Sequence, residues 1–372
     1  MIKVALAHDY LVHIRGGERI LYLLSDLFPA ADIYTLVCDP RIIPHEWNNR
    51  RLNTSFIQRL PFAKKFFRAW LPLYPYAVEQ FDLKKYDLVI SCSSGFVHGV
   101  ITQPGTCHIC YSLSPLRYAW NWYYESIADT GPLSAFLLRV MLHWVRQWDR
   151  QAADRVDDYV AISQVTQRRL LKYYRRDSVV INPPIETSLF GIAEEVDDFF
   201  LIVSALMPYK RVDIAVNAFN SLGLPLKIVG TGPELGRLRK MAKSNIEFLG
   251  RIPDHKVRQY YSRCRAFIFT AEEDYGITPL EAQASGRPVI AYGTGGVLET
   301  VVNGLTGAFF QDQTADSLAE AVSRFDSTQF APLTIREHAT KFDVSVFKKK
   351  MTSFVQASLA KYRSNFGLIP LE

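Results

Sequence analysis

The stretch that decides the fold is Ala266-Phe267-Ile268-Phe269-Thr270, followed after two residues by Glu273-Asp274-Tyr275-Gly276-Ile277-Thr278-Pro279-Leu280-Glu281. The first part is a short apolar run with high β-propensity, and Pro279 suits the first turn of a helix. We therefore predict a strand, a loop that carries Glu273 and a helix that carries Glu281. In an open parallel sheet, such a loop lies at the carboxyl edge, where ligands bind.

The loop and the helix start offer two kinds of ligand contact. Backbone amides at Gly276, Ile277 and Thr278 attract anions, whereas Pro279 has no N–H to donate. The two carboxylates can accept hydrogen bonds from paired hydroxyl groups. A ligand with both hydroxyls and phosphates, such as a nucleotide sugar, matches this mixture. The alternative is structural, with one acid capping the helix and the other solvated on its surface.

The composition is that of a globular protein with several domains. The chain has 372 residues, of which 48% are hydrophobic and 22% are charged. Its net charge of +6 favours an anionic surface or substrate but is too small to indicate nucleic acid. Five cysteines in apolar runs indicate reduced, buried thiols. The sequence shows no signal peptide or membrane span, so we expect a cytoplasmic protein that can bind the inner membrane face peripherally.

Strand-like and helix-like segments alternate twice along the chain. The first series runs from Ile2 to Ile181, and Asn182-Pro183-Pro184 ends it. The second series begins at Phe199. Repeated βα units imply parallel sheets with right-handed crossovers. We predict an α/β protein with one domain at 1–188, a second at 189–342, and a helix at 343–363 that packs back near the first.

Residues 59–76 combine basic and aromatic side chains. Lys64 and Lys65 lie among Phe62, Trp70 and other aromatic residues. One interpretation is a surface that binds anionic lipid. The other is a packed helix whose lysine and arginine stems cover a core. The sequence leaves both open.

Two further motifs are weak signals. Gly16-Gly17 lies between a strand and a helix and suits either a phosphate-binding loop or an ordinary tight turn, because no GxxxxGK or GxGxxG pattern accompanies it. Cys107 and Cys110 form a single CxxC, which without a second pair indicates core packing rather than zinc. We therefore expect no metal site.

Taken together, these motifs resemble glycosyltransferase family 4, a family of retaining sugar-nucleotide transferases. Its GT-B fold has two Rossmann-like parallel-sheet domains that face each other across a cleft. The resemblance covers nearly the whole chain. Its pieces are His8-Asp9, 16–19, 114–120, 182–184, 208–213, 248–250, 273–281, Gly295-Gly296 and Glu299. The pieces at 117–120 and 208–213 resemble the mannosyl- and glucosyltransferase subgroup that builds bacterial O-antigen and exopolysaccharide chains.

The resemblance implies a role for each donor-side residue. Glu281 would hold the ribose hydroxyls, and Glu273 would hold hydroxyls of the donor sugar. Lys210, with Arg211, would face the diphosphate as its negative charge develops. Further donor contacts would come from Gly16, Gly17, Arg251, Ile252, Gly276, Ile277 and Thr278.

On the acceptor side, the resemblance implies that Arg117 and Tyr118 face the cleft. His98 follows a strand and could approach the site, although a structural histidine is the alternative. The acceptor would be a growing oligosaccharide or lipid-linked polysaccharide. The donor would be a UDP-hexose or, as second choice, GDP-mannose. The leaving phosphate would help to deprotonate the acceptor hydroxyl, and no cofactor or metal is expected, since the sequence has no D-x-D.

Two positions depart from the family pattern. Ala205 stands where relatives usually carry an arginine that clasps the diphosphate, and Leu113 stands where they often carry a histidine near the transferred sugar. These departures motivate an alternative, a degenerate member that binds a sugar nucleotide or glycan without turnover. A dinucleotide oxidoreductase also fits the double α/β pattern, but GxGxxG is missing after both first strands.

Overall fold

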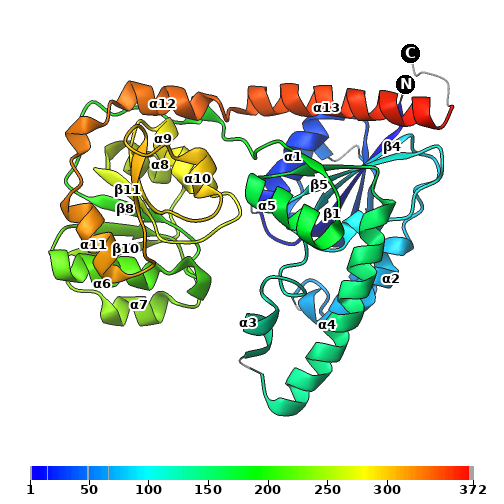
Figure 1. Ribbon diagram of the computed structural model, residues 1–372, viewed down its shortest axis with the longest axis horizontal. Helices are drawn as coiled ribbons and strands as arrows, with labels where there is room; N and C mark the ends of the chain where they lie inside the picture. The colour runs from blue at the N-terminus through cyan, green and yellow to red at the C-terminus, as the bar shows by residue number, and fades with distance from the viewer. Residues whose placement is uncertain (1, 15, 48–49, 66, 129, 368–372) are drawn as a thin grey trace. The chain divides into compact units, whose positions relative to one another are not determined.

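The computed structural model describes residues 2–14, 16–47, 50–65, 67–128 and 130–367 (Figure 1). The chain forms two compact units, residues 1–181 with 348–372 and residues 182–347. Each unit contains one sheet, and every strand pair in both sheets is parallel. Helices connect the strands, as a parallel sheet requires. The predicted α/β class is confirmed.

The sheet of the N-terminal unit has seven strands in the order β3-β2-β1-β4-β5-β6-β7. The strands are β1 (Val4–Leu11), β2 (Asp32–Cys38), β3 (Leu52–Thr54), β4 (Leu88–Ser93), β5 (Cys107–Ser112), β6 (Asp158–Ala161) and β7 (Ser178–Val180). The α-helices are α1 (Gly16–Leu27), α2 (Tyr74–Glu79), α3 (Tyr123–Ala128), α4 (Pro132–Ala152), α5 (Gln164–Arg169) and, from Lys348 onward, α13 (Val344–Asn365). The central strands are apolar and buried because helices cover both faces of the sheet.

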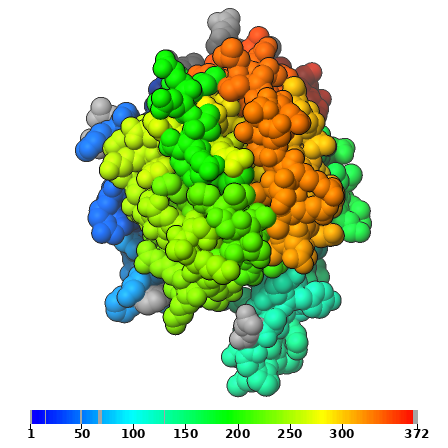
Figure 2. Space-filling model, turned by 90° about the vertical axis from the view of Figure 1, so that its left-hand side faces the viewer, coloured from blue at the N-terminus to red at the C-terminus, as the bar shows by residue number. Residues whose placement is uncertain are grey.

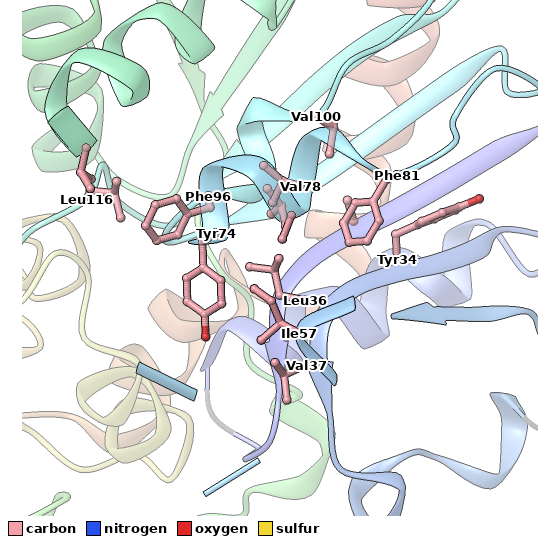
Figure 3. Close-up of a cluster of buried hydrophobic side chains, with 14 of the residues drawn as sticks. Tyr34, Leu36, Val37, Ile57, Tyr74, Val78, Phe81, Phe96, Val100 and Leu116 are labelled. Carbon is pink, nitrogen blue, oxygen red and sulfur yellow. The ribbon is translucent and has the colours of Figure 1, made fainter. Parts of the chain in front are cut away.

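A large hydrophobic cluster fills one side of this sheet (Figure 3). Its labelled members are Tyr34, Leu36, Val37, Ile57, Tyr74, Val78, Phe81, Phe96, Val100 and Leu116. Part of the segment 59–76 belongs to it, because Trp70 and Leu71 pack against the cluster. Phe62 and Tyr76 instead remain exposed. The described part of the segment therefore divides between the core and the surface, whereas residue 66 and the side chains of 67–69 lie outside the described residues.

The C-terminal unit has a six-stranded sheet in the order β10-β9-β8-β11-β12-β13. The strands are β8 (Phe200–Val203), β9 (Leu226–Val229), β10 (Ile246–Gly250), β11 (Ala266–Phe269), β12 (Val289–Tyr292) and β13 (Gly307–Phe310). The α-helices are α6 (Val212–Leu222), α7 (Leu235–Met241), α8 (Asp254–Arg263), α9 (Ile277–Ala284), α10 (Val297–Thr300), α11 (Ala315–Ser323) and α12 (Pro332–Thr340). Figure 2 shows one face of this unit, on which the green segment before β8 runs beside orange α12. Arg336 joins the two by donating to the carbonyl of Phe190. The predicted strand, loop and helix around Glu273 are confirmed as β11, its loop and α9.

Each sheet has one point at which the strand order reverses. In the N-terminal sheet the reversal lies between β1 and β4, and in the C-terminal sheet between β8 and β11. The loops after two such strands leave in opposite directions and open a space at the carboxyl edge. A ligand site in the C-terminal unit is therefore expected at the loops after β8 and β11.

The five cysteines are all free and buried, as predicted. Cys107 and Cys110 lie in β5, inside the N-terminal sheet. In the part of the chain that the structure describes, no cluster of three or more histidine, cysteine or acidic residues could hold a metal ion. None of the described helices is long and apolar enough to cross a membrane.

Candidate functional site at the C-terminal switch point

Lys210 and Glu273 meet at the strand-order reversal of the C-terminal sheet. Lys210 ends the short turn Pro208–Lys210 after β8, and Glu273 lies in the loop after β11. The Nζ of Lys210 forms an ion pair with Oε1 of Glu273. The two side chains are 14% and 25% exposed, so a ligand can reach them. This geometry places an accessible cation beside an accessible carboxylate where parallel sheets bind ligands.

The loop that carries Lys210 is tied to β11 through its backbone. Thr270, directly after β11, donates a hydrogen bond from Oγ1 to the carbonyl of Lys210 over 2.8 Å. The ammonium lies 5.2 Å from the centre of the Tyr209 ring. The ammonium is therefore held by its own loop as well as by Glu273.

A glycine loop after β12 fixes the backbone of Glu273. The amide of Gly296 donates to the carbonyl of Glu273 over 2.8 Å. A Cβ on Gly295 would lie 2.5 Å from that same carbonyl oxygen, and Gly295 has a φ of +84°. Side chains larger than hydrogen do not fit this contact. The Gly295-Gly296 motif of the sequence therefore positions Glu273.

The helix α9 begins beside Glu273. Its first flanking residue, Gly276, has a φ of +89°, and a Cβ there would lie 3.2 Å from the Phe269 ring. Among the described residues, no side chain caps this helix. The first-turn amides of Ile277 and Thr278 therefore face the loop region rather than a capping oxygen, an arrangement that suits an anion.

Glu281 lies further along α9 and is half-buried. The hydroxyl of Tyr261, on α8, donates to its Oε2 over 2.9 Å. This bond orients the carboxylate. Tyr261 was not among the residues that the sequence placed in the site, because its spacing from Glu281 carries no recognisable pattern.

The loops after β9 and β10 extend the same edge of the sheet. The amide of Gly230 donates to the carbonyl of Gly250 over 2.8 Å, and a Cβ on Gly230 would lie 1.9 Å from the carbonyl oxygen of Ser204. Gly230 thus allows the loops after β8 and β9 to touch. Arg251 and Ile252 follow β10 directly, with Arg251 exposed and Ile252 half-buried. Gly230 was not among the site residues predicted from the sequence, although the Gly-Thr-Gly pattern that follows a strand indicates a close backbone contact.

Arg211 is paired within its own loop. It has a φ of +50° at the start of α6, and its guanidinium Nε lies 3.2 Å from Oδ1 of Asp213. The sequence placed Arg211 beside the diphosphate. The structure directs its guanidinium to Asp213, which leaves Lys210 as the cation that contacts Glu273.

Gly16 and Gly17 open α1 in the N-terminal unit. A Cβ on Gly17 would lie 2.7 Å from Cδ1 of Leu113 and 3.4 Å from Cε1 of His8. His8 is buried, and its Nε2 lies 3.7 Å from Oε1 of Glu18. Burial acts to lower the pKa of His8, but interactions with Cys92 and Glu18 outweigh it and raise that pKa well above its usual range. Leu113, one of the two family departures, thus lies against Gly17 in the first turn of α1.

His98 is buried in the N-terminal unit and does not face solvent. Its Nε2 lies 3.3 Å from Oδ1 of Asp149, and its ring stacks on Tyr174 with centroids 5.6 Å apart. Asp149 also accepts hydrogen bonds from Trp120 and Tyr174, and burial raises its pKa. These contacts favour the structural interpretation of His98 that the sequence left open.

Arg117 and Tyr118 are both half-buried. The Arg117 guanidinium lies 4.7 Å from the centre of the Trp122 ring, and Tyr118 packs against the large hydrophobic cluster. Both residues belong to the N-terminal unit, as Gly16, Gly17 and His98 do. The donor-side residues from Lys210 to Glu281 all belong to the C-terminal unit.

Comparison with known proteins finds a family match within the C-terminal unit. Residues 186–342 match the family model of the glycosyl transferases group 1. An uncharacterized glycosyltransferase of Methanocaldococcus jannaschii is 24% identical over 203 residues, which are 53% of this chain and 57% of the relative. A GDP-mannose-dependent alpha-(1-6)-phosphatidylinositol monomannoside mannosyltransferase of Mycobacterium tuberculosis is 33% identical over 139 residues, which are 32% of this chain and 36% of the relative. The chain thus spans less than two thirds of the length of these relatives.

Among solved structures, Alr3699/HepE from Anabaena in complex with UDP superimposes with a TM-score of 0.71. The superposition covers 96% of this chain and all of that one, at 16% sequence identity. Such a low identity shows the fold and not the reaction. The segment that matches the family model contains Lys210, Glu273 and Glu281. The chain therefore has the GT-B fold, and its residues 186–342 are similar to the glycosyl transferases group 1.

Proposed function

We propose that the protein is a glycosyltransferase that moves a hexose from a nucleotide-diphosphate sugar to a glycan acceptor. The observation that carries this proposal is the Lys210–Glu273 ion pair at the strand-order reversal of the C-terminal sheet. The pair lies inside the segment that matches the group 1 glycosyl transferases. A cation and a carboxylate side by side match the diphosphate and the hydroxyl groups of one donor.

Lys210 is proposed to stabilise the leaving diphosphate. An ammonium carries three N–H donors, so Lys210 can keep Glu273 and also bind a phosphate oxygen. Negative charge grows on that oxygen as the bond to the sugar breaks. The amides of Gly276, Ile277 and Thr278 at the start of α9 would bind the same diphosphate or the sugar.

Glu273 and Glu281 are proposed to bind hydroxyl groups at two points along the donor. Glu273, held by the glycine loop, would take hydroxyls of the sugar, and Glu281, oriented by Tyr261, would take the ribose hydroxyls. Arg251 and Ile252 would lie beside the base. The proposed contacts of Gly16, Gly17, Arg117 and Tyr118 with donor and acceptor rest on the resemblance alone.

The reaction is proposed to retain the configuration of the sugar, as family 4 enzymes do. The acceptor oxygen forms its bond to the anomeric carbon on the face from which the phosphate oxygen leaves. The acceptor proton passes to that phosphate oxygen, so neither a covalent protein intermediate nor a metal enters the scheme. Lys210 and the α9 amides carry the developing negative charge.

The donor is proposed to be a UDP-hexose, with GDP-mannose as second choice. The Anabaena neighbour is solved with UDP, and the Mycobacterium tuberculosis relative is GDP-mannose-dependent. That relative acts on a phosphatidylinositol-linked acceptor, which supports a lipid-linked polysaccharide acceptor here. Such an acceptor would place the protein on the inner face of the cytoplasmic membrane.

Donor turnover by the Lys210→Ala variant tests the proposal. A panel of UDP- and GDP-sugars is first screened by thermal shift, because a ligand at about 100 times its Kd adds about 2.7 kcal/mol of stability. The stabilising donor is then mixed with lipid-linked acceptors, and nucleotide release is measured. We expect Lys210→Ala to lower the rate by about 100-fold or more.

Lys227→Ala is the matched control, since Lys227 is also ion-paired, with Glu247 at 2.7 Å, in the same unit. It should leave the rate unchanged. Equal rates in Lys210→Ala and wild type would refute the assigned role.

A binding protein without turnover is the second candidate. Leu113 packs on Gly17, and Ala205 is exposed where an arginine is usual in the family. Tight donor binding by calorimetry with no glycosylated product by mass spectrometry would favour it over transfer.

A further inference from the structure

The helix α4 has an apolar face that its own unit leaves uncovered. Ala135, Leu142 and Val145 are buried on one side. Five large apolar residues are exposed, which are Leu133, Phe136, Leu137, Val140 and Trp144. Their spacing places them on one side of the helix, and we call them the α4 stripe. Leu133 and Trp144 are 73% and 68% exposed, so the stripe is open at both ends.

The position of α4 in its unit explains why the stripe is uncovered. Figure 1 shows α3 and the N-terminal half of α4 extending beyond the strands of the N-terminal sheet. On the neighbouring α3, Tyr124 is 82% exposed as well. Exposed apolar patches of this kind on a single chain mark a surface that meets a partner or a membrane.

The charged residues within the stretch that carries the stripe are basic. Between Thr130 and Trp148 the sequence contains Arg139, His143 and Arg146 but no acidic residue. Arg139 and His143 are exposed and adjoin the stripe along the helix. The acid of α4, Asp149, is fully buried. Asp129, four residues before the stripe, lies outside the described residues, and the nearest exposed acid that the structure describes before the stripe is Glu125 on α3.

We propose that the α4 stripe docks the protein on an anionic lipid bilayer, with α4 lying in the plane of the interface. Leucine, phenylalanine and tryptophan on one side, with arginine beside them, are the composition of interfacial helices. The apolar side chains would enter the boundary between headgroups and acyl chains, and Arg139 would contact lipid phosphates. This docking goes beyond the proposed transfer reaction and does not require turnover.

A second copy of the chain fits the stripe less well. Two stripes packed together would bring Arg139 near that of the partner, and the stripe has no acid to pair with it. Like charges at an interface oppose association. An anionic bilayer satisfies both the apolar and the basic parts of the surface.

The inference changes the membrane contact that the sequence placed at residues 59–76. In that segment Trp70 and Leu71 pack against the core, whereas Phe62, Lys64 and Lys65 are exposed. Among the side chains that the structure describes, the α4 stripe has five exposed large apolar residues and segment 59–76 has three, Phe62, Leu73 and Tyr76. The two assignments make different predictions for mutants.

Vesicle co-sedimentation of the full chain tests the proposal. Vesicles of phosphatidylcholine alone are compared with vesicles that also contain phosphatidylglycerol. We expect wild type to bind the anionic vesicles and to dissociate as salt rises, because salt screens the basic contacts. The double variant Phe136→Ser, Trp144→Ser should bind about tenfold or more weakly, since binding scales with buried apolar area.

Two controls separate docking from folding and from the transfer reaction. Leu333→Ser removes another exposed leucine, on α12 of the C-terminal unit, and should bind vesicles as wild type does. The double variant leaves the buried face of α4 intact, so its circular dichroism melting curve and its thermal shift with the nucleotide sugar should match wild type.

Three outcomes would overturn the proposal. The double variant could bind as tightly as wild type. Binding could be lost in Lys64→Glu, Lys65→Glu and kept in the double variant. Light scattering could show a wild-type dimer that the double variant converts to monomer, which would assign the stripe to a second copy.

Discussion

The loops at the two strand-order reversals of this molecule are held by different interactions. In the N-terminal unit, the carboxylate of Asp9, at the end of β1, accepts hydrogen bonds from the amides of Ser94, Phe96 and Val97 over 2.7, 2.6 and 3.0 Å. In the C-terminal unit, the loops after β8 and β11 are joined by the Lys210–Glu273 ion pair.

The difference shows how one topology can serve structure at one place and chemistry at another. Asp9 is buried, and it occupies loop amides that an anionic ligand could otherwise bind. Lys210 and Glu273 are partly exposed side chains, and each can accept a second partner. The amides after β4 are therefore already occupied by Asp9, whereas Lys210 and Glu273 remain available to a ligand.

The largest expected effect on stability is that of Asp9→Ala. This change leaves three amides without their acceptor, of which those of Phe96 and Val97 are buried, and loss of a buried charged partner costs about 3–5 kcal/mol. Urea denaturation should show the loss. Asp26→Ala, which removes an exposed carboxylate on α1, is the matched control and should change stability little. A small loss in Asp9→Ala would show that the N-terminal reversal is not held by this carboxylate.

A smaller effect, taken per pH unit, is expected from acid, and it belongs to the N-terminal unit. His108 is buried beside Ser91, and burial, with the charge of His98, lowers its pKa from 6.5 to about 3. Below the pKa that His108 has in the unfolded chain, the unfolded state binds more protons at this residue than the folded state does. Stability is therefore present above about pH 6.5 and lost towards pH 3, by about 1.4 kcal/mol per pH unit.

The variant His108→Gln checks this dependence. It should flatten the acid limb of the stability curve, while His255→Gln, at an exposed histidine on α8, should not. An unchanged acid limb in His108→Gln would mean that another group controls the transition.

The smallest expected effect on stability is that of Glu273→Ala. Partly exposed ion pairs contribute about 1 kcal/mol or less to folding. Chemical denaturation should therefore separate this variant clearly from Asp9→Ala, although donor binding should weaken in Glu273→Ala. Equal losses of stability in Glu273→Ala and Asp9→Ala would contradict the conclusion that the two reversals differ in what they contribute to folding.

The sequence predicted the part of the site that depends on neighbouring residues, which is β11, its loop and α9. The β-prone run before Thr270, Gly276 and Pro279 determined β11, its loop and α9, because each acts over a few residues. Lys210 can contact Glu273 because β8 pairs with β11. The two strands are far apart in the sequence. The family resemblance predicted that both residues bind the donor, but it did not predict that they contact each other.

Long-range contacts also explain what the sequence could not decide. Asp9 binds amides more than eighty residues away, so its role leaves no local pattern. His98 follows a strand, as a site histidine would, but Asp149 and Tyr174 enclose it from distant helices. The surface of α4 was not predicted, because the periodicity of an amphipathic helix does not reveal whether a partner covers each face.

The buried cysteines make the chain suitable for site-directed labelling. Burial raises the pKa of Cys38 to about 11 and of Cys107 and Cys264 to about 12, and Cys92 and Cys110 are shifted in the same direction. Maleimides react with thiolates at accessible positions, so the native thiols should react slowly. A single cysteine introduced at Leu137 could then carry a spin label without removal of any native cysteine. Its relaxation by oxygen and by nickel chelates would report how deeply α4 enters a bilayer.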